Sequence, residues 1–382
     1  MNILITGGAG FIGLNLCRVL VNDNHKVRII DNFSKQIHGN NNSLPIDLLD
    51  KVELINSDIR DRETLKNSLV DIDTIIHLAA ETGTGQSMYE VEHYYSVNIQ
   101  ATATLIDILQ DHSIAKNIKN IIVASSRAVY GEGAYLCNEH GIIYPDQRLK
   151  SALEIGNFDP VCPICSNQLI LQSTTELGPF KPMSFYGITK QVQEQTILMY
   201  AKNKNINAFA LRYQNVYGPG QSLNNPYTGI LAVFSNLAKE GKKIEVYEDG
   251  NESRDFVYID DVVDATYKAI KFDGNFVGPL NIGSGTPVSV IEVANTINKY
   301  FGYKSKVEIT GAFRIGDIRH NKADLNLSNH ILNYFPKVNF ETGINNFLKW
   351  AEINESSNHK SYEDSVKELQ NYGLMGITKN VI

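Results

Sequence analysis

The stretch ITGGAGFIG, residues 5–13, decides the expected fold of this chain. It joins a short apolar run, Ile3–Ile5, to a segment with apolar residues at helical spacing, and it places glycines at Gly7, Gly10 and Gly13. Glycine permits a tight turn and lets backbone N–H groups approach a pyrophosphate at a helix N-terminus. Alone, the pattern also fits an ordinary tight turn. Between a strand and an amphipathic helix it predicts a dinucleotide-binding site.

Strand-length apolar runs alternate with helix-period segments beyond this turn. Such alternation predicts the α/β class, with a Rossmann-type doubly wound parallel sheet and a smaller C-terminal α/β substrate lobe. The expected strands are Ile3–Ile5, Val27–Ile30, Val52–Ile55, Thr74–Leu78, Ile121–Ala124 and Ala208–Tyr213.

A chain of 382 residues with 43% hydrophobic content exceeds what a single core usually holds. We expect residues 1–215 to form the dinucleotide-binding domain, interrupted by an irregular insert at 134–178. Residues 216–350 should form mainly the substrate lobe, with some segments returning to the sheet. Residues 351–382 are polar, and we expect a peripheral tail with a helix from about 362 to 370.

Composition excludes several classes of partner. The formal net charge of −7 gives no basic field for a nucleic acid or an anionic membrane. No apolar run approaches the length of a membrane span, and the N-terminus lacks the features of a signal peptide, so we expect a cytoplasmic protein. Four cysteines are too few for a disulfide scaffold.

The second expected strand ends in Asp31-Asn32, where a carboxylate can accept hydrogen bonds from a ribose diol. The same carboxylate repels the 2′-phosphate of NADP, so NAD is the expected cofactor. Asp58 follows the third strand and is expected either to contact the adenine or to cap a helix. The other expected cofactor contacts are Phe11, Ile12, Asn32, Ile59, Leu78, Ala79 and Ala80.

Two further segments predict the reacting groups. SSRAVYG, residues 125–131, ends the fifth strand, and SFYGITK, residues 184–190, contains Tyr186 and Lys190. At i and i+4 on a helix these two side chains share a face, so we expect the ammonium to lower the pKa of the phenol and to hold the nicotinamide ribose. The phenol can take a proton from a sugar hydroxyl while a serine holds the same oxygen. Tyr-x-x-x-Lys also occurs on ordinary helices.

These motifs, in this order over about residues 1–350, resemble the extended short-chain dehydrogenases, in the NAD-dependent nucleotide-sugar epimerase/dehydratase family. The resemblance implies Ser126, Tyr186 and Lys190 as catalytic residues, with Ser125 as the neighbouring alternative. It also implies NAD, a nucleotide-diphosphate sugar, and a homodimer formed through helices around 92–110 and 185–202. Leu105, Ile108 and Leu109 are apolar positions at helical spacing that support such an interface.

The resemblance also implies contacts to the sugar diphosphate. They are Asn215 in LRYQNVYGPG (211–220), Arg254 in RDFVYIDD (254–261) and Arg314 in RIGDIR (314–319). A guanidinium matches diphosphate oxygens well, although each arginine could instead form an ion pair with a nearby aspartate.

The reaction is expected to be a 4-epimerisation. Family 4,6-dehydratases carry Asp-Glu where this chain has Arg127-Ala128, which disfavours elimination. SRAVYGEG (126–133) and GDIRH (316–320) are most similar to the dTDP-L-rhamnose 4-epimerase group, so a dTDP-6-deoxyhexose such as dTDP-L-rhamnose is the expected substrate. The alternatives are a 2-epimerase, a 4-keto reductase, a UDP-sugar 4-epimerase, and a cofactor-bound binding protein.

The insert carries a separate motif. CNEH (137–140) and CPIC (162–165) form a C-x2-H and a C-x2-C pair separated by 21 residues. Cys137, His140, Cys162 and Cys165 together supply the four N/S ligands of a structural zinc site. The alternative is three reduced thiols and a loop histidine, and no catalytic metal is expected.

Overall fold

The computed structural model describes residues 1–382 except 224, 226–228, 355–361 and 380–382. Its centre is a seven-stranded sheet in the order β13-β9-β5-β4-β1-β2-β3, in which all neighbours pair in parallel. The order reverses between β1 and β4, which creates a crevice at the carboxyl ends of these strands. This confirms the Rossmann-type α/β class. The strands are β1 (Asn2–Thr6), β2 (Lys26–Asp31), β3 (Glu53–Asn56), β4 (Thr74–His77), β5 (Asn120–Ser126), β9 (Asn207–Tyr213) and β13 (Val277–Ile282).

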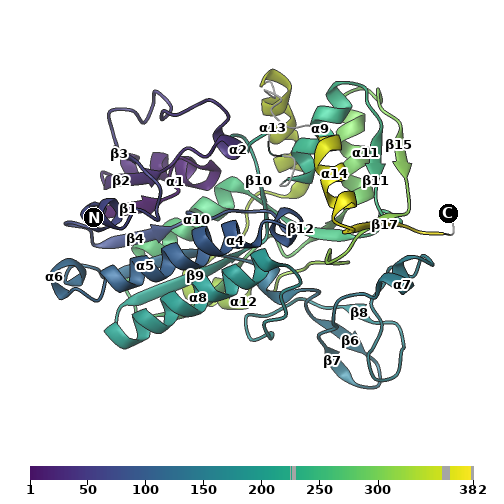
Figure 1. The fold of residues 1–382 in the computed structure, drawn as a ribbon, viewed down its shortest axis with the longest axis horizontal. Coiled ribbons are helices and arrows are strands. Elements are labelled where there is room, and N and C mark those ends of the chain that lie inside the picture. The colour runs from purple at the N-terminus through teal and green to yellow at the C-terminus, as the bar shows by residue number, and fades with distance from the viewer. Residues whose placement is uncertain (224, 226–228, 355–361, 380–382) are drawn as a thin grey trace.

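Helices cover both faces of the sheet (Figure 1). On one face α1 (Phe11–Asn22) packs on α10 (Ile259–Lys271), and α12 (Asn326–Leu332) contacts α10 and β13. On the other face α5 (Ala101–Ile108) lies against α3 (Arg62–Ser68) and α8 (Phe185–Lys204). Shorter helices are α2 (Lys35–His38), α4 (Val91–Tyr94) and α6 (His112–Ala115), and Tyr95–Gln100 forms a π-helical turn.

The α5 segment corrects one expectation. Leu105, Ile108 and Leu109 are buried in the hydrophobic core beneath the helix. They pack inside the subunit, so these three residues are not available to a dimer interface.

A second lobe follows β9 and stands over the carboxyl ends of the sheet. Its strands form three small sheets, β10-β12-β14, β11-β15 and β16-β17. They are β10 (Asn215–Tyr217), β11 (Ile244–Val246), β12 (Ser253–Tyr258), β14 (Pro287–Ser289), β15 (Val307–Ile309), β16 (Ala312–Arg314) and β17 (Met375–Ile377). The lobe's helices are α9 (Ile230–Lys239), α11 (Val290–Tyr300), α13 (Phe340–Ile353) and α14 (Tyr362–Asn371).

The C-terminal segment is less peripheral than expected. The predicted helix exists as α14, but β17 pairs with β16 and so fixes this segment to the lobe. Tyr362 on α14 hydrogen-bonds through its hydroxyl to the hydroxyl of Tyr247 at 2.8 Å. Residues 355–361 and 380–382 of the expected tail lie outside the described residues.

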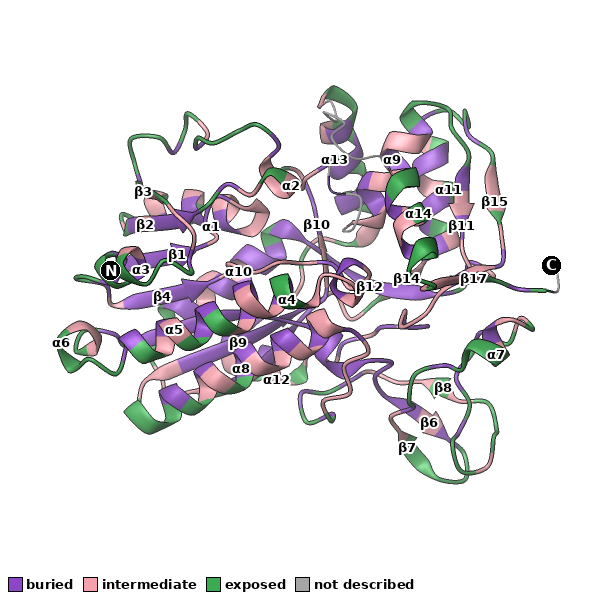
Figure 2. Cartoon of the chain, viewed as in Figure 1, coloured by how far each residue is buried: buried purple, intermediate pink, exposed green. Residues whose placement is uncertain are grey.

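The insert projects from the body and presents much exposed surface (Figure 2). It contains a three-stranded antiparallel sheet of β6 (Tyr135–Cys137), β7 (Gly141–Ile143) and β8 (Ile170–Leu171), with one short helix, α7 (Lys150–Leu153). Across the described part of the chain, we find no helix with the length and apolar character that a membrane crossing requires.

Candidate active site

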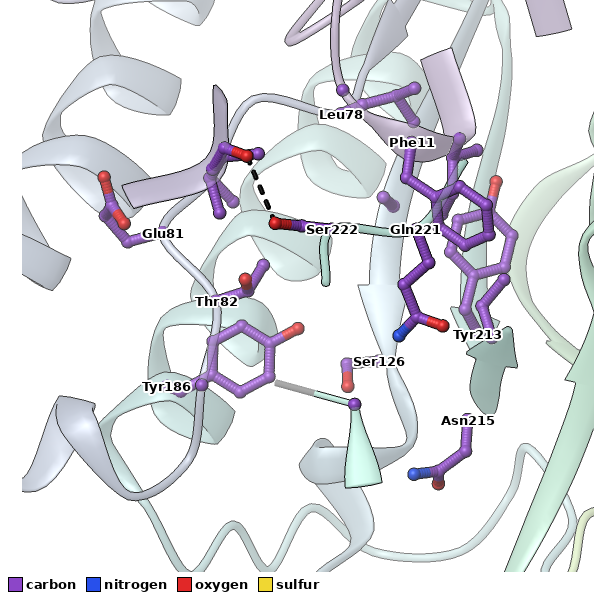
Figure 3. A pocket seen from close by; sticks show the side chains of 18 of the residues that line it. Phe11, Leu78, Glu81, Thr82, Ser126, Tyr186, Tyr213, Asn215, Gln221 and Ser222 are labelled. Carbon is purple, nitrogen blue, oxygen red and sulfur yellow. Dashed lines mark hydrogen bonds between the residues drawn. The ribbon is translucent and has the colours of Figure 1, made fainter. Parts of the chain in front are cut away.

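A cavity of 740 Å³ lies between the sheet and the lobe (Figure 3). Its wall includes the glycine turn, the ends of β2, β4 and β5, the start of α8, and residues of the lobe. Every cofactor, catalytic and substrate residue predicted from the sequence lines it, and the four cysteine and histidine residues of the insert do not. The predicted cofactor contacts are Gly7, Gly10, Phe11, Ile12, Gly13, Asp31, Asn32, Asp58, Ile59, Leu78, Ala79, Ala80, Tyr186 and Lys190. The predicted catalytic serine is Ser126, and the predicted substrate contacts are Asn215, Arg254 and Arg314.

The glycine turn leaves no room for side chains. Gly7 has φ +67°, and a Cβ there would lie 2.7 Å from the backbone nitrogen of Ala79. A Cβ on Gly13 would lie 2.5 Å from the carbonyl oxygen of Gly8. Gly10 is the N-cap residue of α1 and has no side chain. The N-terminus of the helix is therefore open to the cavity. This backbone cradle fits a dinucleotide pyrophosphate.

Asp31 is buried at the end of β2 and holds the glycine turn in place. Its carboxylate accepts hydrogen bonds from the backbone N–H of Ala9 at 3.0 Å and of Phe33 at 2.9 Å. A carboxylate has about four lone-pair sites, so acceptor capacity remains for a ribose hydroxyl. The imidazole Nε2 of His38 lies 3.6 Å from the same carboxylate, a neighbour that sequence reasoning did not single out.

Asp58 is bound by Arg60. The guanidinium donates to both carboxylate oxygens at 2.8 and 2.7 Å, and this interaction lowers the pKa of Asp58 to about 2. The helix-cap alternative is wrong, since Asp61 caps α3 by accepting from the N–H groups of Glu63 and Thr64. Asp58 still borders the cavity, so adenine contact stays a prediction.

Two adjacent serines end β5 and differ in their partners. The side chains of Ser126 and Tyr186 both line the cavity (Figure 3), and Ser126 Oγ accepts from the backbone N–H of Ala128 at 3.1 Å. Ser125 Oγ donates to Glu194 at 2.6 Å, and that carboxylate is ion-paired with Arg212. The hydroxyl of Ser125 is therefore held by Glu194, whereas that of Ser126 lies in the cavity with the phenol of Tyr186.

Lys190 lies beside Tyr186, one turn along α8. Its ammonium is 5.9 Å from the centroid of the phenol ring and donates to the carbonyl of Ala124 at 2.8 Å. Burial lowers the pKa of Lys190 to about 7. Burial raises the pKa of Tyr186, while the nearby hydroxyl of Ser126 and the charge of Arg127 oppose that rise. The expected lowering of the Tyr186 pKa by Lys190 is thus wrong for the free protein, because loss of solvation outweighs the nearby cations.

Arg127 borders the cavity beside these groups, a position that sequence reasoning used only to disfavour elimination. No hydrogen bond or ion pair of its guanidinium occurs within the described part of the chain. Burial and the neighbouring charge of Arg254 lower the pKa of Arg127 to about 10, so it remains a cation at neutral pH. An unpaired cation at a cavity wall is suited to an anionic or strongly polar ligand.

The three predicted diphosphate contacts differ in availability. Arg254 donates to the carbonyls of Ser253, Ile318 and Arg319 and to the carboxylate of Asp317, as the ion-pair alternative expected.

Asn215 Oδ1 and Arg314 Nε, in contrast, are buried without a partner among the described residues. Gln221 Oε1 is a third such atom, and in Figure 3 the side chains of Gln221 and Asn215 approach the space near Ser126. Buried polar atoms usually find partners, so these three indicate a polar ligand.

Comparisons with known proteins agree with this geometry. The model of the NAD dependent epimerase/dehydratase family matches residues 3–146 and 155–283. A dTDP-L-rhamnose 4-epimerase of Burkholderia thailandensis is 41% identical over 350 residues, which cover 91% of this chain and 94% of that protein. A UDP-glucose 4-epimerase of Mycolicibacterium smegmatis is 28% identical, with coverage of 90% and 96%.

Solved structures give the same fold. A UDP-glucuronic acid 4-epimerase of Bacillus cereus, in complex with UDP-glucuronic acid and NAD, superposes with a TM-score of 0.73 at 26% identity and covers 92% of this chain and 99% of that one. A UDP-glucose 4-epimerase of Thermotoga maritima with UDP-glucose gives 0.71 at 27% identity, covering 92% and 98%.

Proposed function

The chain belongs to the NAD-dependent epimerase/dehydratase family, and from that premise we propose that it inverts C4 of a nucleotide-activated sugar, with dTDP-L-rhamnose as substrate. Ser126 and Tyr186 carry this proposal, because both line one cavity between a dinucleotide cradle and polar groups of the lobe that have no partner among the described residues. The B. thailandensis relative, similar along nearly the whole chain, supports the choice of nucleotide and sugar.

The glycine turn and Asp31 would hold NAD. When bound, NAD supplies the two-electron acceptor that takes the C4 hydrogen as hydride and returns it. Backbone N–H groups at the start of α1 would face the pyrophosphate, while the Asp31 carboxylate would accept from a ribose hydroxyl and disfavour a 2′-phosphate. Lys190 positions the nicotinamide ribose from the adjacent wall.

Tyr186 handles the proton. In its deprotonated form the Tyr186 side chain takes the proton of the C4 hydroxyl during oxidation, and the resulting phenol gives it back to the same oxygen during reduction, while Ser126 hydrogen-bonds that oxygen. Inversion requires the keto-sugar to turn over between the two steps. Where family dehydratases carry Asp-Glu, this chain has Arg127-Ala128, so it lacks the acidic pair that would eliminate water.

At the other end of the cavity, Arg314 and Asn215 hold the diphosphate through atoms that have no partner among the described residues. Arg127, charged and without an ion pair among the described residues, contacts the sugar or the diphosphate near C4. Arg254 keeps a supporting part, since it fixes the 317–319 segment that forms one wall. The protein acts as a homodimer in this proposal, through the outer surfaces of α5 and α8.

The test is NMR of purified protein with dTDP-L-rhamnose and no added cofactor. We expect conversion to a mixture with the C4 epimer, without net production of NADH. UDP-glucose and UDP-glucuronic acid serve as competing substrates. Turnover of a UDP-sugar alone would overturn the substrate assignment, and stoichiometric consumption of added NADH would identify a reductase. Bound NAD without turnover of any of these sugars would contradict epimerisation.

A further inference from the structure

Four potential ligand atoms gather at the tip of the insert, away from the cavity. The three sulfurs of Cys137, Cys162 and Cys165 and the Nδ1 of His140 all lie within 4.8 Å of one another. Cys137 Sγ is 3.6 Å from Cys165 Sγ and 3.5 Å from His140 Nδ1, and Cys162 Sγ is 3.6 Å from the same nitrogen. The cysteines are free thiols.

The three separations of 3.5 to 3.6 Å match those of a tetrahedral metal centre. Zn–S bonds of about 2.3 Å and Zn–N bonds of about 2.0 Å place sulfurs about 3.8 Å apart and a sulfur about 3.5 Å from a nitrogen. We propose that Cys137, His140, Cys162 and Cys165 bind one structural zinc ion that holds the insert together. All four positions are taken by protein, so the site is closed and leaves no position for catalysis.

The two ligand turns have the same local structure. Backbone N–H groups of Glu139 and His140 donate to the sulfur of Cys137. Backbone N–H groups of Ile164 and Cys165 donate to the sulfur of Cys162. In both turns the donors lie two and three residues after the cysteine. Such outer hydrogen bonds orient thiolate ligands and offset their charge.

Each turn also ends in a left-handed residue. Gly141, after His140, has φ +72°, and Ser166, after Cys165, has φ +60°. A serine in this region is strained by about 1 kcal/mol or more, and such strain persists only where the surroundings over-determine it. A metal ion bound by both turns would hold this strained backbone in place.

The tip has little else to stabilise it. Cys137 and Cys162 are buried, yet the neighbouring apolar side chains of Ile142, Ile164 and Ile170 are exposed. The insert's small apolar cluster, Leu153 and Phe158 against Phe313, lies outside the ligand turns. A metal can replace missing apolar burial as the source of folding free energy.

The base of the insert is tied to the cavity wall. Arg148 donates to the carbonyl of Phe158 and to the carboxylate of Glu248, which borders the cavity. The backbone N–H of Ala134 donates to Thr174 Oγ1 at 2.9 Å, joining the two stems. Zinc at the tip therefore orders a segment whose base supports the substrate side, and its loss should affect the sugar before NAD.

The primary experiment is elemental analysis of full-length protein prepared without chelator. We expect about one zinc per chain, lost in Cys162→Ser and in His140→Ala. Cys17→Ala is the matched control, since Cys17 is a buried thiol of α1 outside the cluster, and it should keep the metal. His140→Cys should also keep it, because four cysteines form an equally closed set.

A second readout separates folding failure from loss of a ligand. Refolding with Co²⁺ should give thiolate-to-metal charge-transfer bands and the strong d–d bands of tetrahedral cobalt. Chelation should open the insert to protease while α8 stays protected. Wild-type protein without zinc, zinc retained in both Cys162→Ser and His140→Ala, or a mass lower by two hydrogens from a disulfide would each overturn the proposal.

Discussion

At the end of β5 the partners of two adjacent hydroxyls predict opposite effects of the same mutation. Ser126→Ala removes the hydroxyl that lines the cavity beside Tyr186 and should lower kcat by about tenfold to a hundredfold with little change in Tm. Ser125→Ala removes a buried bond to Glu194 and should lower stability by about 1–3 kcal/mol while kcat is nearly kept. Steady-state kinetics and thermal unfolding of both variants measure this, and equal kcat losses would contradict the assignment.

Tyr186→Phe deletes one oxygen with almost no change in volume. We expect folded protein that still carries NAD and whose turnover falls by about 10² to 10⁴. Burial raises the pKa of this phenol in the free protein, so the proton-accepting form should become more abundant, and the reaction faster, toward alkaline pH. Near-normal activity of the variant would assign the proton transfer to another group.

Glu252 borders the cavity and predicts a pH effect on stability. Burial and the charge of Glu248 raise the pKa of Glu252 to about 8, from an ordinary value of 4.5. The folded state then binds more protons than the unfolded state between these values, so stability falls as pH rises from 4.5 to about 8, at up to about 1.4 kcal/mol per unit. Thermal unfolding should show a weaker decline over pH 6 to 8 in Glu252→Gln. Parallel profiles for the two proteins would refute this.

At the scale of elements, sequence patterns predicted the turns and strands that depend on neighbouring residues in the chain. The glycine turn and six strands of the central sheet follow from residues adjacent in the chain. The seventh strand, β13, was missed because its sequence VGPLNI contains a glycine and a proline, which are unfavourable in strands. Its pairing with β9 depends on a partner about 70 residues away, which periodicity does not report.

The residues of the site likewise fall into those predicted from local motifs and those placed by tertiary packing. Ser126, Tyr186 and Lys190 belong to compact motifs, and the sequence predicted that they meet. Gln221 and Tyr362 belong to no motif and reach the cavity only through the packing of the lobe on the sheet. For Arg127 the signal was present, as an arginine directly after the serine, but only its lack of an ion partner in the described structure gives it a function.

The helix α14 therefore carries its own prediction. Tyr362 lines the cavity and hydrogen-bonds with Tyr247, whose ring lies 5.0 Å from the guanidinium of Arg314. Tyr362→Ala should raise KM for the nucleotide sugar about tenfold, the effect of losing about 1.4 kcal/mol, with NAD content unchanged. Tyr372→Ala is the control, because this exposed ring stacks on Tyr89 outside the cavity. Equal KM changes in both variants would show that α14 acts only on stability.

At the scale of the whole molecule, the lobe, the insert and the sheet meet in a buried network of charges. Arg319 of the lobe bonds Asp159 of the insert at 2.7 Å and Asp249 at 2.7 Å, and Arg148 of the insert contacts Glu132 and Glu248. Removing one partner of such a network leaves an uncompensated buried charge. The network ties the insert to the lobe, and one of its members, Glu248, borders the cavity.

The last prediction concerns the outer surface of α5 and α8. With Leu105 inside the subunit, the apolar side chains at this surface include the half-buried Ile99, Phe185 and Val192 and the 68% exposed Met199. The two helices lie side by side, so a second copy related by a two-fold axis would bury this surface as a four-helix bundle. We expect a dimer at micromolar concentration by light scattering, and Met199→Asp should weaken it by placing an unpaired charge in the interface. Ile46→Asp is the control, since Ile46 is 92% exposed on a distant loop and should leave the dimer intact. A monomeric wild-type protein, or dissociation by both variants alike, would refute this interface.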